Sequence, residues 1–265
     1  MLEPLPTLRP PARPEPAFAR NLPASAAFRW LAQGWGDLSA HPGPSLAYGA
    51  FLVILSYAVL YALHAWGLLY LALPAIAGFL IVGPFLAVGL YEKSRRHAEG
   101  GRATLADMLA LRPASGAQLA YAGLFLGLLV LFWIRSADLL YALFFGLKPF
   151  PGAEHALTNA FTTPRGWALI ATGTLVGGLF AAFAFAISVF SVPMLVSDRR
   201  DALTAMGMSF AMTTQNLRPM LAWGAIVTAG LVLSALTGLL GLLVIFPVLG
   251  HGTWHAWKTI AEGGE

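Results

Sequence analysis

Long apolar segments are the feature of this sequence that most limits its fold. A helix needs about 20 mainly apolar residues to cross a membrane, and six segments approach or exceed that length. The segments are residues 45–64, 67–90, 116–136, 166–195, 219–236 and 238–257. The last two are separated only by a tight turn, because residues 219–257 are too many for one span. The sequence therefore predicts an all-α integral membrane protein with six transmembrane helices.

The composition leads to the same fold class. The chain is 58% hydrophobic and only 11% charged, whereas soluble domains carry roughly 25% charged residues. The absence of cysteine excludes disulfides, iron–sulfur clusters and thiolate chemistry. Residues 1–23 are rich in proline and lack the apolar core of a signal peptide, so we expect a disordered cytoplasmic tail there.

The distribution of basic residues predicts the orientation in the membrane. With six spans, thirteen of the sixteen Lys and Arg fall on the side of the N-terminus or at the helix ends facing it. Only Arg135, Lys148 and Arg165 fall on the other side. Because basic residues accumulate in cytoplasmic loops, both termini are predicted to be cytoplasmic. The abundance of alanine, and of arginine over lysine, favours a bacterial inner membrane; no nucleic acid is expected as a partner.

The chain also repeats itself. Spans one, three and five begin with LAYG, LAYAG and LAWG, and the tripeptide LRP, with Arg112 and Arg218, precedes two of them. Spans two, four and six carry Pro84, Pro193 and Pro247 in their inner portions and end in YEKSRR, SDRR and HGTWHAWK. Three hairpins in the same orientation imply a pseudo-threefold axis along the membrane normal.

We assign the three hairpins to residues 24–97, 98–200 and 201–265. Each is expected to begin with a short amphipathic helix at the cytoplasmic interface, and in the second Thr104 and Asp107 have the spacing of a capping box. The longest outer loop is predicted at residues 137–165. Its apolar run, residues 139–145, is too short to span and is expected in the outer interface.

Small and charged residues within the spans suggest contacts. Two G-x-x-x-G pairs, which let helix backbones approach closely, are expected to pack the bundle or to form a homo-oligomer face; they are Gly123 with Gly127 and Gly173 with Gly177. Arg135 and Asp138 are three residues apart and are expected to pair on one helix face. This outer pair would either anchor the helix in the headgroups or act as a gate.

The segment HGTWHAWK is the strongest candidate for chemistry. His251 and His255 are four residues apart, so on a helix they share a face on which they could hold a metal or a haem. His64 lies at the opposite end of its span and cannot be their partner. The competing interpretation is the interfacial exit of the last span, where tryptophan and cationic groups are common. No cofactor is predicted, and the sequence contains none of G-x-S-x-G, H-E-x-x-H or a P-loop.

Most of the chain resembles a known family, most clearly in its last third. The matching stretches, between about Pro193 and Trp257, are SVPMLVSDRRDALTAMGMSF, NLRPMLAW and FPVLGHGTWHAW. They are similar to a family of uncharacterised bacterial inner-membrane proteins with a domain of unknown function, some labelled as a cytochrome c oxidase subunit. The resemblance implies no established activity. The oxidase label implies haem and copper ligands that this sequence does not show, so it suggests at most association with a respiratory complex.

Three functional hypotheses follow. The first is a non-enzymatic accessory or assembly partner of a larger membrane complex, with a respiratory complex as one candidate, bound to a membrane-protein partner or to a second copy. The second is a transporter, channel or lipid-handling protein for apolar or lipid-like cargo, because the spans contain few polar groups. The third is a haem- or metal-binding redox protein that uses His251 and His255.

Overall fold

The computed structural model describes residues 18–110, 113–146 and 153–263. Every regular element in this part of the chain is a helix, and it contains no strand. The elements are α1 (Ala26–Ala40), α2 (Pro42–Ala65), η1 (Leu69–Leu71), α3 (Ala72–Leu86), α4 (Val88–Ala98), α5 (Leu105–Leu109), α6 (Gly116–Phe145), α7 (Ala153–Thr162), α8 (Pro164–Ser188), α9 (Ser191–Ser197), α10 (Ala202–Gln215), α11 (Leu217–Leu236), η2 (Leu240–Leu243) and α12 (Ile245–Glu262).

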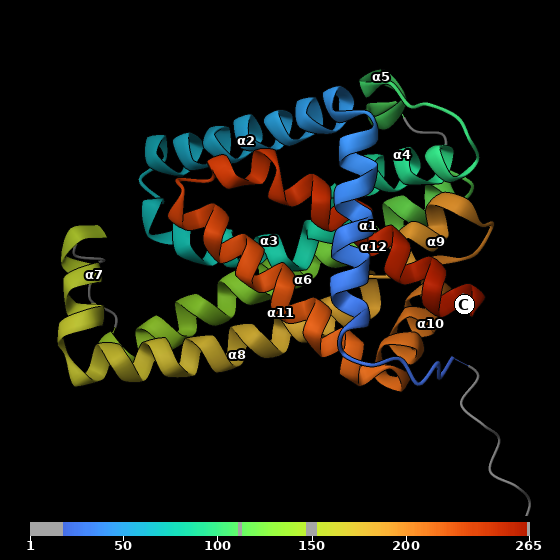
Figure 1. Cartoon of the computed structure of the whole chain (residues 1–265). Coiled ribbons are helices and arrows are strands. Elements are labelled where there is room, and N and C mark those ends of the chain that lie inside the picture. Colours follow the sequence, from blue (N-terminus) through green and yellow to red (C-terminus); the bar gives the residue numbers. More distant parts are fainter. Residues whose placement is uncertain (1–17, 111–112, 147–152, 264–265) are drawn as a thin grey trace, which may run out of the picture.

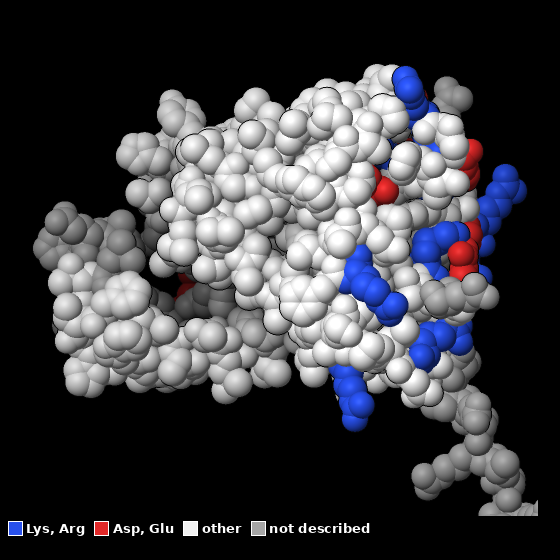
Figure 2. Space-filling view, viewed as in Figure 1, with Lys and Arg blue, Asp and Glu red and all other residues white. Residues whose placement is uncertain are grey.

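The long helices lie side by side and one helix crosses them. In Figure 1, α2, α3, α6, α8, α11 and α12 run across the view, while α1 crosses the bundle steeply near one end. The C-terminus lies at that same end, and α7 lies at the opposite one. Lys and Arg visible in Figure 2 gather toward the end that holds the C-terminus. We call this the charged end and the other the apolar end.

Five helical segments of the described chain are long and apolar enough to cross a membrane. They are Pro42–Ala65, Ala72–Ala98, Gly116–Phe145, Pro164–Ser197 and Leu217–Leu236. This agrees with the prediction of an all-helical, multi-span membrane protein. The sixth predicted span, 238–257, is not among the five. It corresponds to η2 and α12, and α12 carries His251, His255, Lys258 and Glu262, which lower its hydropathy.

The returning segments are each interrupted near a predicted proline. Pro84 lies inside α3, and the helix ends two residues later, at Leu86. Pro193 and Pro247 instead occupy the first turn of α9 and α12. Proline has no N–H for the helical ladder and crowds the preceding turn, so it is tolerated at a helix start and promotes a break when it lies further inside.

The outer region differs from its prediction. Residues 139–145 do not form a separate interfacial segment but continue α6 without interruption to Phe145. The run contains no proline or glycine, so nothing in it stops the helix. The helix ends at Gly146, which has a positive φ of 77° and whose N–H bonds to the Ala142 carbonyl. The predicted loop 137–165 also contains α7.

Much of the bulkiest core lies toward the charged end. Trp30 of α1 and Trp223 of α11 are buried and meet edge to face, with ring centroids 6.0 Å apart. Glycine makes the crossing of α1 over α12 possible, because a Cβ on Gly34 would overlap the carbonyl oxygen of Val248. On α12, a Cβ at Gly252 would lie 2.6 Å from the Trp223 ring and 3.0 Å from the Trp30 carbonyl. The core is therefore built on backbone-to-backbone approach.

Candidate functional site

A chain of five polar residues is buried where α1, α2, α4 and α12 meet. His251 is fully enclosed; its Nε2 lies 2.9 Å from Ser45 Oγ and its Nδ1 lies 2.7 Å from Ser94 Oγ. Lys93 Nζ donates to Ser45 Oγ at 2.6 Å, and Ser94 Oγ donates to Asp37 Oδ2 at 2.5 Å. We call Lys93, Ser45, His251, Ser94 and Asp37 the buried chain.

The partners give the buried chain a direction. An ammonium group can only donate, so Ser45 accepts from Lys93 and has its own hydrogen free for His251. Ser94 gives its only hydrogen to the Asp37 carboxylate, so it must accept from an Nδ1–H of His251. In a neutral imidazole Nε2 is then unprotonated and accepts from Ser45. The hydrogen bonds therefore run one way, from an ammonium to a carboxylate, through a neutral His251 with hydrogen on Nδ1.

Both ends of the buried chain have further partners. Lys93 Nζ also donates to the backbone carbonyls of Asp37, at 3.0 Å, and His41, at 2.7 Å. These carbonyls belong to the last turn and C-cap of α1, where helical carbonyls lack intrahelical partners and favour a cation. At the other end, His255 Nε2 lies 3.0 Å from Asp37 Oδ2. The buried chain thus fixes the C-terminal end of α1 to α4 and α12.

Two opposing effects act on the Asp37 carboxyl group. Burial raises its pKa, because a charge is disfavoured away from water. Hydrogen bonds from His255 and Ser94 favour the charged form and outweigh the burial, so the pKa of Asp37 lies below its usual value. The carboxylate is thus held ionised by its partners.

The local sequence brings these groups together. Trp30, Gly34 and Asp37 lie on one face of α1, and all three are buried. Gly34 permits close approach to α12, and Trp30 Nε1 donates to Thr259 Oγ1 of α12 at 3.2 Å. Asp37 is thereby placed within hydrogen-bonding distance of His255 and of Ser94, and Ser94 in turn contacts His251. A carboxylate on the buried stripe of a helix costs free energy unless it is paired.

The arrangement resembles a catalytic serine with a histidine base, but its burial argues against that chemistry. In nucleophilic catalysis a serine hydroxyl bonds to histidine, which a third group orients; Ser45, His251 and Ser94 match this pattern. Ser45 and His251 are each 0% exposed, so a substrate carbonyl has no approach to the hydroxyl in this conformation. The buried chain is therefore best interpreted as a brace between helices.

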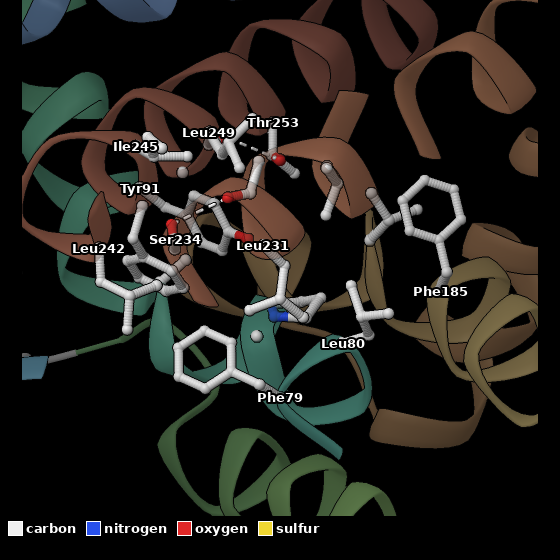
Figure 3. A pocket seen from close by; sticks show the side chains of 18 residues that line it. Phe79, Leu80, Tyr91, Phe185, Leu231, Ser234, Leu242, Ile245, Leu249 and Thr253 are labelled. Carbon is white, nitrogen blue, oxygen red and sulfur yellow. Dashed lines mark hydrogen bonds between the residues drawn. The ribbon is translucent and has the colours of Figure 1, made fainter. Parts of the chain in front are cut away.

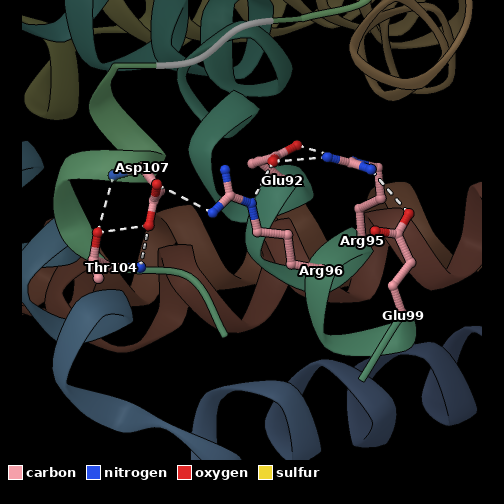
Figure 4. Close-up of polar contacts among 6 residues, drawn as sticks. All are labelled: Glu92, Arg95, Arg96, Glu99, Thr104 and Asp107. Carbon is pink, nitrogen blue, oxygen red and sulfur yellow. Dashed lines mark hydrogen bonds and ion pairs between the residues drawn. The ribbon is translucent and has the colours of Figure 1, made fainter. Parts of the chain in front are cut away.

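A second polar cluster connects α4 to α5 (Figure 4). Glu92, which is largely buried, accepts two hydrogen bonds from Arg95, at 2.8 and 3.0 Å, and one from Arg96 at 2.7 Å. Arg96 also pairs with Asp107 at 3.1 Å. Asp107 and Thr104 form the predicted capping box of α5, and the hydrogen bonds from Thr104 lower the pKa of Asp107. The arginines of YEKSRR thus bind carboxylates of the same protein.

Of the two histidines predicted as weak metal candidates, His251 belongs to the buried chain and His255 contacts its Asp37 end. Both ring nitrogens of His251 are at hydrogen-bonding distance from serine hydroxyls, and His255 Nε2 faces Asp37. Within the part of the chain that the structure describes, no group of three or more His, Cys, Asp or Glu is placed to hold a metal ion. Three of the four ring nitrogens of this pair therefore already lie at hydrogen-bonding distance from another side chain.

The predicted packing glycines divide into two kinds. A Cβ on Gly123 would lie 2.6 Å from the Phe85 ring, and one on Gly177 would lie 2.6 Å from the Trp133 ring. These two glycines therefore receive aromatic side chains rather than another backbone. Apart from its chain neighbours and its own helix backbone, a Cβ on Gly127 or Gly173 would meet no atom of the described residues within 4 Å. These two glycines therefore face open space.

The remaining predicted residues lie apart from the buried chain. Arg135 and Asp138 pair at 3.1 Å on α6, with Arg135 mostly exposed. Pro84 is half-buried in α3, whereas Pro193 and Pro247 are buried. Arg218 is exposed at the start of α11, and Arg112 lies outside the described residues.

Sequence reasoning missed four members of the buried chain: Asp37, Ser45, Lys93 and Ser94. One signal was available, because Asp37 follows Trp30 by seven residues and falls on the buried face of α1. An acidic residue there indicates a buried partner. Lys93 and Ser94 belong to YEKSRR, which the sequence predicts as a basic helix exit, and Ser45 carries no distinguishing spacing.

Comparison with known proteins identifies part of the chain. Residues 72–197 match the model of a family described as "Predicted integral membrane protein (DUF2189)". The match overlaps the resembling segment of the last third only at its beginning, and it lends no support to the oxidase label. No curated protein and no solved structure matches the chain. Residues 72–197, which run from α3 to α9, thus match a family described as integral membrane proteins of unknown function, and the chain is a multi-pass helical membrane protein.

Proposed function

We propose that the chain crosses a bacterial inner membrane six times, with both termini cytoplasmic. The gathering of Lys and Arg at the charged end (Figure 2) supports this orientation. A second support is that the two ends of the described chain meet: Arg20 donates to the carbonyls of Ile260, at 2.9 Å, and Ala261, at 3.3 Å. An even number of crossings leaves both ends of the chain on the same side of the membrane. In this topology α12 is the sixth span, and it is shielded from lipid by the surrounding helices.

Cysteine labelling tests this topology directly, because the natural chain has no cysteine. Thr162→Cys on α7, Thr214→Cys on α10 and Glu262→Cys on α12 are each exposed. With a membrane-impermeant maleimide, Thr162→Cys is expected to react in intact spheroplasts. The other two are expected to react only after permeabilisation, and the reverse pattern would refute the proposal.

We also propose three hairpins with approximate threefold symmetry. The support is a recurring order of elements: a helix at the charged end (α1, α5, α10), a long span (α2, α6, α11) and a returning segment broken near a proline. The copies have diverged, since α5 has five residues and α1 has fifteen. Their different lengths limit the symmetry to the spans.

The proposed role is that of a non-enzymatic accessory or assembly partner in a larger membrane complex. One observation carries it: an exposed stripe of small residues on α8, formed by Ala171, Thr174, Gly178 and Ala182. Small residues at helical spacing let a second transmembrane helix approach closely. The bulky Leu175 and Leu179, which are also exposed, flank the stripe. We call Ala171, Thr174, Gly178 and Ala182 the α8 stripe, and the occupant we propose is a transmembrane helix of a partner.

Purification of the tagged full-length chain from its native membrane in mild detergent tests this role. A stoichiometric partner, identified by mass spectrometry, is expected with the natural sequence and is expected to be lost with Gly178→Leu. Gly127→Leu on α6 is the matched control, because Gly127 also faces open space. A chain that purifies alone, or a partner retained equally by both variants, would contradict the proposal.

A further inference from the structure

An apolar pocket lies between spans (Figure 3). It encloses about 70 Å³ and is lined by residues of α3, α4, α8, α11, η2 and α12. Among them are Phe79, Leu80, Phe185, Leu231 and Phe246, and no lining residue is charged. The pocket and the buried chain use different faces of α12, since Leu249, Gly250 and Thr253 line the pocket whereas His251 and His255 belong to the brace.

The lining contains three side-chain hydroxyl groups, those of Tyr91, Ser234 and Thr253, and the last two are already engaged. Ser234 Oγ donates to the Gly230 carbonyl at 2.8 Å. Thr253 Oγ1 donates to the Leu249 carbonyl at 2.9 Å and accepts from Trp223 Nε1 at 3.3 Å. A polar ligand would lose its own hydrogen bonds on entering such a site, so the lining favours a ligand made of hydrocarbon.

The pocket opens on the side of the membrane-spanning surface. Leu80 and Pro84 on α3, and Val227 and Gly230 on α11, line it and are half-buried. They belong to the spans Ala72–Ala98 and Leu217–Leu236, whose exposed surface faces hydrocarbon in a bilayer. Whatever enters between these helices therefore comes from the bilayer interior.

The local sequence explains why this space is not filled by side chains. Gly83 and Pro84 lie at the end of α3, just before the helix breaks, and a Cβ on Gly83 would meet nothing within 4 Å in the described residues. On the facing helix, the space beside Gly230 is taken by Ile245 and Leu249 of α12, since a Cβ there would lie 2.9 Å from the Ile245 side chain. The open space in the lining is therefore at Gly83, and a larger residue at 83 would fill it.

We propose that this pocket binds the end of a phospholipid acyl chain taken from the surrounding bilayer. The enclosed volume of about 70 Å³ compares with about 30 Å³ for one water molecule in the liquid, so it holds only the last carbons of a chain. The rest of the chain lies in the opening between α3 and α11. Because lipid tails are as apolar as leucine, binding rests on packing rather than on the hydrophobic effect, and the bound lipid exchanges with the bilayer.

Photo-crosslinking of the full-length chain in phospholipid vesicles tests this site. The probe is a phosphatidylglycerol with a diazirine at the end of one acyl chain, used beside one with the diazirine near the headgroup. Peptide mapping is expected to show enrichment of the chain-end probe on residues 79–84 and 227–231 over the lipid-facing residues Leu124, Leu128 and Leu131 of α6. The headgroup-proximal probe is expected to show no such enrichment.

Gly83→Leu is the variant that fills the pocket, and Gly127→Leu is its matched control at an equally open position. Gly83→Leu is expected to reduce labelling of residues 227–231 to the level of the lipid-facing residues, while Gly127→Leu leaves it unchanged. Equal labelling in both variants, or no enrichment in the natural sequence, would overturn the proposal. Should Gly83→Leu fail to fold, enrichment in the natural sequence and the contrast between the two probes decide.

Discussion

The charged end and the apolar end of the bundle are built on different principles. At the charged end, glycine lets backbones touch, tryptophans fill the core, and the buried chain connects four helices. Toward the apolar end, large side chains such as Tyr61, Trp66, Leu139 and Leu143 are mostly exposed. The difference indicates that the charged end holds the bundle together and that the apolar surface remains available to lipid or to a partner.

The largest expected effect comes from breaking the brace. Lys93→Met leaves Ser45 and two helix-end carbonyls without their donor, and it removes the positive charge that balances Asp37. Each buried group left without its hydrogen-bond partner costs about 1–3 kcal/mol, and three acceptors lose their donor here. We expect such a loss in the free energy of unfolding, measured by denaturant titration in micelles. Arg135→Met, at the exposed pair of the apolar end, is the control with little effect; equal losses would remove the contrast.

A smaller loss is expected at the crossing of α1 and α12. Gly34→Ala places a methyl group against the Val248 carbonyl, and overpacking of a tight contact costs about 1–3 kcal/mol. Gly127→Ala meets open space and is expected to change stability by less than about 1 kcal/mol. Thermal unfolding of both variants in the same detergent checks this. Two equal melting temperatures would show that α1 is not closely docked.

Ser94→Ala tests one connection of the buried chain. It removes a donor to Asp37 and leaves the Nδ1–H of His251 without an acceptor, and a buried unsatisfied group costs about 1–3 kcal/mol. Ser136→Ala on α6 removes only a hydroxyl that bonds within its own helix, to Phe132. We expect a measurable loss in unfolding free energy for Ser94→Ala alone. If Ser136→Ala lost as much, the position of the serine would be irrelevant.

The smallest expected effect is a dependence on acid. Because the folded-state pKa of Asp37 is lowered, its stabilisation is complete above the unfolded-state value of about 3.9. It is lost as pH falls through the folded-state pKa. Asp37→Asn is therefore expected to be less stable at neutral pH and to lose less than the natural chain on acidification, as followed by thermal unfolding from pH 7 to pH 3. Identical pH profiles would contradict this contribution.

Much of the architecture could be predicted, because a bilayer imposes a length and a polarity on each span. Residues 45–64, 116–136 and 219–236 all lie within observed helices, and Thr104 with Asp107 caps α5 as expected. The extension of α6 to Phe145 was missed because a short apolar run looks the same whether it continues a helix or lies beside one. The match of residues 72–197 supports the membrane family but not the topology in detail.

The candidate site was harder to predict for a physical reason. His251 and His255 share a helix face, and spacing alone suits a metal as well as a brace. What distinguishes the two is the set of partners, which arrive from helices separated by many residues: Ser45, Ser94 and Asp37. No local pattern in one sequence reports such contacts. The exception is Asp37, whose place on the buried face of α1 already indicated a partner.

The central claim is that the hydrogen bonds of the buried chain run in one direction, from Lys93 to Asp37, and it can be tested at His251. Nitrogen-15 NMR of histidine-labelled protein in lipid, assigned with His251→Phe, reports which ring nitrogen carries hydrogen. The buried chain predicts a neutral ring at pH 7, with hydrogen on Nδ1 and a hydrogen-bonded, unprotonated Nε2. An imidazolium, or hydrogen on Nε2 alone, would contradict it.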